Sequence, residues 1–155
     1  MKTEKAIFAA GCFWGIQAAF DEVKGVVKTT VGYTGGTTKK PSYEDVCTDA
    51  TGHAEAVMVE FDPTKVSYGR LLDTFWKIHD PTQFNKQGPD VGTQYRSAIF
   101  YYGEKQKDAA EKSLKNVQKK LKRPIATQIV EAKEFYPAEE YHQKYMENRK
   151  SSCTG

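Results

Sequence analysis

Apolar residues recur along the chain with two different spacings, and these spacings predict its secondary structure. Residues 5–10 are apolar on both faces, as is typical of a central strand. From Ile16 to Val23, apolar residues follow at the spacing of a helix's buried face. The same reading of the whole chain predicts strands at 5–10, 26–33, 53–61, 96–102 and 125–132, and helices at 13–24, 67–79, 104–123 and 138–150.

The order of these elements predicts the fold class. A leading β-α-β-β-α-β order favours an α/β (α+β) fold, namely a ferredoxin-like split βαβ two-layer sandwich with helices on one face. Long loops and a C-terminal tail at 151–155 complete the prediction. Because 155 residues suffice for one sizeable core but not for two, we expect residues 1–155 to form a single domain. Residues 82–94 show no periodicity, and so long a loop is usually functional or disordered.

Charge and composition narrow the range of partners. The net charge of +3 gives no reason to expect a nucleic-acid or membrane partner. The many lysines at 104–123 are interspersed with acids, which favours a solvated helix face. No stretch of the sequence is long and apolar enough to span a bilayer.

The cysteines indicate a reducing compartment. There are three of them, far apart, with no C-x-x-C pair and no zinc-site spacing, so we expect no metal. An odd, sparse count fits the cytoplasm better than a secreted disulfide scaffold. The N-terminus imitates a signal peptide, but its apolar run is short and the predicted helix continues past Cys12. We therefore expect a cytoplasmic protein.

Cys12 is the first candidate for chemistry, because it lies where a strand turns into a helix. Unpaired N–H groups and the helix dipole stabilise a thiolate at a helix N-terminus. Gly11 and Gly15 leave room for a tight turn and for another group to approach the backbone. The alternative is an inert cysteine buried in the core.

Other residues could assist such a thiol. Alternation places Glu55 on the more apolar face of its strand, where desolvation should raise its pKa and make it a proton donor. A solvated Glu55 at the sheet edge is the alternative. Tyr33 and Tyr95 stand at loop junctions, where a phenol can donate to an oxyanion or simply pack. Phe13 and Trp14 could wall a pocket for a methyl group, or could be core residues.

The remaining histidines and cysteines leave further alternatives open. His53, His79 and His142 are the candidates for a Cys–His dyad. Cys47 lies in a polar stretch without flanking bases, so we expect a buried or inert thiol. Cys153 lies in the tail, from which it could reach another thiol to form a disulfide.

Five motifs, in order, match one family. They are residues 11–15 (GCFWG), 31–36 (VGYTGG), 52–57 (GHAEAV), 90–97 (DVGTQYRS) and 141–143 (YHQ). Together they resemble the A-type peptide methionine sulfoxide reductases over essentially the whole chain. The resemblance implies an enzyme that reduces the S epimer of methionine sulfoxide, free or in proteins, without a metal or organic cofactor.

The resemblance also implies a role for each matching residue. Cys12 would attack the sulfoxide sulfur and Glu55 would protonate its oxygen. Tyr33 and Tyr95 would hold that oxygen, and Asp90 would help to order the site. Phe13 and Trp14 would receive the S-methyl group.

Recycling depends on a second thiol. A single tail cysteine, Cys153, resembles the subgroup with one resolving cysteine, which thioredoxin regenerates. Cys12 would become a sulfenic acid, condense with Cys153 to a disulfide, and be freed by dithiol exchange. We expect oxidised proteins, free methionine sulfoxide and thioredoxin as partners, and a monomer.

Two other classes remain possible from the residues alone. A cysteine hydrolase would pair Cys12 with a histidine and an oxyanion hole. A non-enzymatic thiol redox sensor would only switch Cys12 and Cys153 between oxidation states. Of the three classes, only a reductase would make methionine catalytically from methionine sulfoxide and dithiothreitol.

Overall fold

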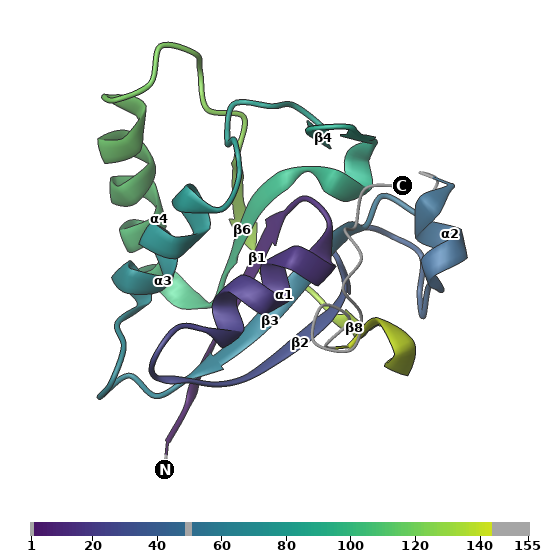
Figure 1. The fold of residues 1–155 in the computed structure, drawn as a ribbon, viewed down its shortest axis with the longest axis horizontal. Helices are drawn as coiled ribbons and strands as arrows, with labels where there is room; N and C mark the ends of the chain where they lie inside the picture. Colours follow the sequence, from purple (N-terminus) through teal and green to yellow (C-terminus); the bar gives the residue numbers. More distant parts are fainter. Residues whose placement is uncertain (1, 49–50, 144–155) are drawn as a thin grey trace.

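A six-stranded sheet forms the centre of the molecule (Figure 1). The computed structural model describes residues 2–48 and 51–143. The sheet order is β7-β6-β1-β3-β2-β8, and its strands are β1 (Glu4–Ala10), β2 (Val26–Thr34), β3 (Ala54–Phe61), β6 (Ser97–Tyr101), β7 (Gln128–Glu131) and β8 (Tyr136–Pro137). A small hairpin comprises β4 (Lys86–Gln87) and β5 (Asp90–Val91). The helices are α1 (Phe13–Asp21), α2 (Tyr43–Cys47), α3 (Tyr68–Lys77) and α4 (Gly103–Gln118), with short 3-10 helices η1 (Thr93–Tyr95) and η2 (Glu140–His142).

The connections between the strands confirm the mixed α/β class predicted from the sequence. Strand β3 pairs antiparallel with both β1 and β2, so it is inserted between two strands that α1 connects. Strand β6 pairs antiparallel with the other edge of β1. Helix α4 then crosses over to β7, which runs parallel to β6.

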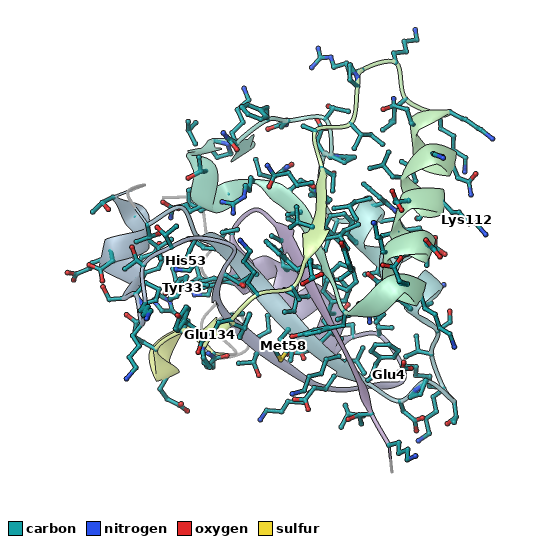
Figure 2. The ribbon with its side chains drawn as sticks, turned by 180° about the vertical axis from the view of Figure 1, so that it is seen from behind. Glu4, Tyr33, His53, Met58, Lys112 and Glu134 are labelled. Carbon is teal, nitrogen blue, oxygen red and sulfur yellow. The ribbon has the colours of Figure 1, made fainter. Side chains whose placement is uncertain are left out.

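Alternation along the strands gives the sheet two different faces. Ala6, Phe8 and Ala10 point to the face that α1, α3 and α4 cover (Figure 1). The Phe8 ring stacks on Phe20 of α1, with 5.0 Å between centroids. The intervening Ile7 belongs to a smaller cluster on the opposite face, and that cluster is covered by the chain before β8. Figure 2, turned by 180° from the view of Figure 1, shows the molecule from the side of this second face, with Met58 and Glu134 labelled.

Two predicted features at the site end of the molecule are wrong. The polar stretch around Cys47 contains a short helix, α2, whose N-cap Ser42 forms a capping box with Asp45. Cys47 is the last residue of this helix and is exposed, not buried. The helix predicted at 138–150 does not follow Pro137, because Pro137 lies in β8 opposite Gly32 and residues 140–142 form the 3-10 helix η2. Residues 144–150 lie outside the described residues. A Cβ at Gly32 would clash with the Tyr136 carbonyl oxygen, so only glycine allows β8 to approach so closely.

Other boundaries differ by a few residues. The helix predicted at 104–123 ends at Gln118, and the strand predicted at 125–132 is confined to Gln128–Glu131. The stretch 82–94 contains the β4–β5 hairpin and the start of η1. In the ranges that the structure describes, no helix is both long and apolar enough to cross a membrane.

A series of hydrogen bonds through His79 connects α3 to β6. The Nδ1 atom of His79 bonds the Phe75 carbonyl oxygen at 2.8 Å, and its Nε2 atom bonds the Ser97 hydroxyl at 2.7 Å. Ser97 Oγ also bonds the Thr127 hydroxyl at 2.7 Å. Burial lowers the pKa of His79 from 6.5 to about 4, although the Phe75 bond and Asp80 oppose the shift. The imidazole is therefore neutral at pH 7, with both nitrogens engaged.

This low pKa predicts a loss of stability in acid. The unfolded chain protonates His79 near pH 6.5 but the folded chain only near 4, so its contribution is complete above pH 6.5 and lost as pH falls to about 4. The shift corresponds to at most about 3 kcal/mol. We expect the free energy of unfolding, measured with urea, to fall less steeply over this range in His79→Gln than in the unmodified chain. Equal slopes would contradict the assignment.

Candidate active site

Cys12 occupies the N-cap of α1, as the sequence predicts. Strand β1 ends at Ala10, and Gly11 then turns the chain with a φ of +101°. Cys12 itself has φ −59° and ψ 122°, just outside the helix. The residue is partly exposed, so it is not the buried core cysteine of the alternative interpretation. Cys12 thus stands at the N-terminus of a nine-residue helix, a position that favours the thiolate.

Glu55 lies beside the same helix N-terminus. It stands on β3 in the middle of the sheet and is only 1% exposed, so it is not a solvated edge residue. Its Oε1 atom accepts the backbone N–H of Phe13 at 3.3 Å, and its Oε2 atom accepts an N–H of Gln94 at 3.0 Å. A buried carboxyl group therefore lies next to the residue that follows Cys12.

The β4–β5 hairpin brings Asp90 and Tyr95 to this side of the sheet. Gln87 packs against Gly11, where an added Cβ would lie 3.0 Å from the Gln87 side chain. The Gln87 amide bonds Asp80 at both its backbone N–H and its carbonyl oxygen. Burial raises the pKa of Asp90. Burial, and then the charges of Glu55 and Asp90, raise the pKa of Tyr95, which keeps its phenol protonated.

Five rings gather around the start of α1. Phe13 is fully buried and lies 5.7 Å from Tyr33, 6.3 Å from Trp14 and 5.4 Å from His142, between ring centroids. Tyr43 completes the group at 4.5 Å from His142. The residues come from α1, β2, α2 and η2, so the aromatic group joins four separate parts of the chain. Phe13 and Trp14 thus belong to one apolar group beside Cys12.

The polar atoms of these rings are also engaged. The indole N–H of Trp14 donates to His142 Nδ1 at 2.9 Å. The fully buried Tyr33 donates its hydroxyl to Glu139 at 3.1 Å, and the same carboxylate accepts the Tyr43 N–H at 3.0 Å. Although burial opposes it, these bonds contribute to a lowered pKa of Glu139. Burial, followed by the charge of Glu55, raises the pKa of Tyr43.

Two of the three candidate histidines are committed elsewhere. His53 accepts the Gly36 N–H at Nδ1, 3.0 Å away, and its Nε2 atom lies 2.6 Å from the Thr38 carbonyl oxygen. His79 bonds Phe75 and Ser97. Neither ring has a nitrogen left for a Cys–His dyad, whereas His142 lies in the aromatic group.

The two other cysteines, Cys47 and Cys153, lie in different parts of the chain. Cys47 Sγ lies 3.6 Å from Gln94 Nε2, at the rim of the site. Cys153 lies outside the described residues. Within residues 2–48 and 51–143, no group of three or more His, Cys, Asp and Glu side chains could hold a metal ion.

The sequence interpretation missed Gln94, Tyr43 and Glu139, and did not assign His142 to Trp14. Gln94 stood inside the matched 90–97 motif but was not singled out. Tyr43 follows Ser42 by one residue, and the Ser42–Asp45 spacing is a capping signal that could have revealed α2. Glu139 carried no sequence signal that we can identify.

Comparison with known proteins agrees with this geometry. A sequence model of the family described as "Peptide methionine sulfoxide reductase" matches residues 4–154. The enzyme MsrA of Methanosarcina acetivorans is 64% identical over 148 residues, which cover 94% of this chain and 79% of the relative. The structure of methionine sulfoxide reductase A of Corynebacterium diphtheriae has a TM-score of 0.94 at 40% identity, covering 97% of this chain and 77% of that one.

Mxr1 from Saccharomyces cerevisiae provides a comparison in two states. In reduced form it has a TM-score of 0.93 at 37% identity, covering 97% of this chain and 88% of its own. In complex with Trx2 the TM-score is 0.67 at 29% identity, covering 93% and 85%. This chain therefore belongs to the peptide methionine sulfoxide reductases. It is an enzyme that reduces methionine sulfoxide with thiols.

The Trp14–His142 bond predicts a pH-dependent signal. An indole N–H only donates, so His142 Nδ1 must be unprotonated. Burial lowers the pKa of His142 below 6.5, although Glu139 opposes the shift. The bond should hold above pH 6.5 and break only as pH falls through this lower value.

We expect Trp14 fluorescence, measured in a Trp76→Phe background, to change with a midpoint below pH 6.5. Adding His142→Gln removes the titrating ring and should abolish the change. A midpoint at or above 6.5, or a change that survives His142→Gln, would contradict the prediction.

Proposed function

We propose that this enzyme reduces the S epimer of methionine sulfoxide, free or in proteins, with Cys12 as nucleophile and Glu55 as general acid. The observation that carries the proposal is the hydrogen bond from Phe13 N–H to Glu55. It places a buried carboxyl group one residue from a thiol at a helix N-terminus. The Cys12 thiol and the Glu55 carboxyl group are therefore both located at the N-terminal end of α1, which supports these two roles.

The chemistry balances with these two groups. The Cys12 thiolate forms a bond to the sulfoxide sulfur while Glu55 gives its proton to the sulfoxide oxygen. The resulting hydroxyl group then passes from the substrate sulfur to the Cys12 sulfur, and methionine leaves as both its S–O bond and its new bond to Cys12 break. Cys12 is oxidised to a sulfenic acid as the substrate is reduced by two electrons.

Phenols and rings would orient the substrate. The raised pKa of Tyr95 keeps it a donor toward the sulfoxide oxygen. Tyr33 would be a second donor by turning its hydroxyl away from Glu139, and Asp90 would order Tyr95 through its charge. Phe13 and Trp14 would receive the S-methyl group. Their membership of one apolar group supports this role.

Recycling would use Cys153 and thioredoxin. The sulfenic acid condenses with the Cys153 thiol, releases water and forms a disulfide, which a dithiol partner reduces by exchange. The complex of the related Mxr1 with Trx2 supports thioredoxin as that partner. We further propose a cytoplasmic monomer without metal or organic cofactor. The sparse, unpatterned cysteines support the reducing compartment.

The acid role predicts a rate effect at Glu55. Glu55→Gln keeps the size of the side chain but cannot donate a carboxyl proton, so we expect methionine formation in a single turnover to slow by roughly 10²–10⁴-fold. Substrate affinity should change little. Rapid quenching with Cys12→Ser as the zero control measures this. Turnover by Cys12→Ser, or only a few-fold loss in Glu55→Gln, would overturn the respective assignment.

The resolving role predicts a stall after one turnover. Cys153→Ser should form about one methionine per enzyme and then stop with thioredoxin, because no disulfide forms for exchange. A small thiol at high concentration should partly restore turnover by reaching the sulfenic acid directly. Cys47→Ser is the matched control and should behave like the unmodified enzyme. If turnover instead survives loss of Cys153 and fails on loss of Cys47, the resolving thiol is Cys47.

A further inference from the structure

Gln94 is a buried amide at the centre of the site that the chemistry above does not use. It lies in η1 and is 3% exposed. Helix η1 starts after Gly92, whose φ is +138°, and the Tyr95 N–H bonds the Gly92 carbonyl oxygen at 3.0 Å. The turn therefore directs Gln94 inward while Tyr95 follows at the site.

The amide of Gln94 contacts the acid directly. Its Nε2 atom donates to Glu55 Oε2 at 3.0 Å, while the Phe13 N–H donates to Oε1 at 3.3 Å. Two donors on two oxygens, from separate segments, fix the plane of the carboxyl group. The carboxyl group is therefore held in a defined direction relative to α1 and η1.

A second contact holds the same amide, and Cys47→Ser would keep it because a serine hydroxyl is also an acceptor. Gln94 Nε2 also lies 3.6 Å from Cys47 Sγ, a weak acceptor at the end of α2. The two amide hydrogens thus have two acceptors on different elements. Rotation of the amide would lose the Glu55 bond and the Cys47 contact together.

We propose that Gln94 is a positioning residue that aims the Glu55 carboxyl at the sulfoxide oxygen. This inference rests on the proposed acid role of Glu55. Proton transfer demands hydrogen-bond geometry between acid and acceptor, and a misplacement of about 1 Å can cost about 10²-fold in rate. The aromatic group that would bind the substrate does not depend on this amide, so binding should be spared.

A double-mutant cycle tests the inference. Gln94→Met has nearly the same length without the N–H donors, and we expect it to slow single-turnover methionine formation by about 10- to 100-fold, with KM changed by less than about 3-fold. In the Glu55→Gln background the same substitution should cost less than about 3-fold, because no acid remains to be aimed. A merely structural role would instead cost the same factor in both backgrounds.

Matched controls complete the experiment. Gln106→Met removes an amide that bonds the Tyr102 N–H and the Lys5 carbonyl oxygen, away from Glu55, and should leave the rate unchanged. Gln94→Asn keeps an amide, but its side chain is too short to reach Glu55. If Gln94→Met fails to fold, the same cycle is measured with Gln94→Asn.

The outcomes separate the two proposals. An unchanged rate in Gln94→Met, or equal losses in both backgrounds, would overturn the positioning role while the effect of Glu55→Gln remains. A near-normal Glu55→Gln enzyme would overturn the acid role, and the positioning role with it.

Discussion

The hydrogen bond from Phe13 N–H to Glu55 joins the start of α1 to the middle of the sheet. The first N–H groups of a helix have no partner within the helix, and here a buried carboxyl from β3 supplies one. The same N-terminus faces Cys12, so two acidic groups share one favourable position. In the proposed mechanism, the Cys12 thiol attacks the sulfoxide sulfur and the Glu55 carboxyl group protonates its oxygen.

The sheet sets this pair in place through its register. Tyr33 lies opposite Glu55 on β2, and Ala10 at the end of β1 lies opposite Ser97 on β6. Since β1 and β2 flank β3, a shift of one residue in β3 would turn Glu55 to the other face and leave the helix without its acceptor. Val57, Val59 and Phe61 of β3 are buried in the core cluster on the helix side of the sheet, and their burial fixes that register.

The spacing of apolar residues was sufficient to predict features that depend on a single helix or strand. The run before Cys12 and the helix spacing after it located the N-cap, and alternation located the inward face of Glu55. The same spacing could not predict contacts between segments that are far apart in the sequence. Gln94 meets Glu55 across 39 positions of sequence and Trp14 meets His142 across 128, with no periodicity to link them. The helix predicted from residue 138 was wrong at its start, because the fixed φ of Pro137 suits both the start of a helix and an edge strand.

The segments that contain Tyr43 and His142 are held differently from the elements that contain Cys12 and Glu55. Cys12 and Glu55 depend on long central strands, whereas Tyr43 lies in a five-residue helix and His142 follows a two-residue strand. Side chains hold these two short segments: Glu139 accepts the Tyr43 N–H, and the Gln143 amide bonds both the N–H and the carbonyl oxygen of Val31. In the proposed mechanism, the Cys12 thiol meets first a methyl sulfoxide and then a second thiol, which requires a stable scaffold beneath Cys12 and access to it for both partners.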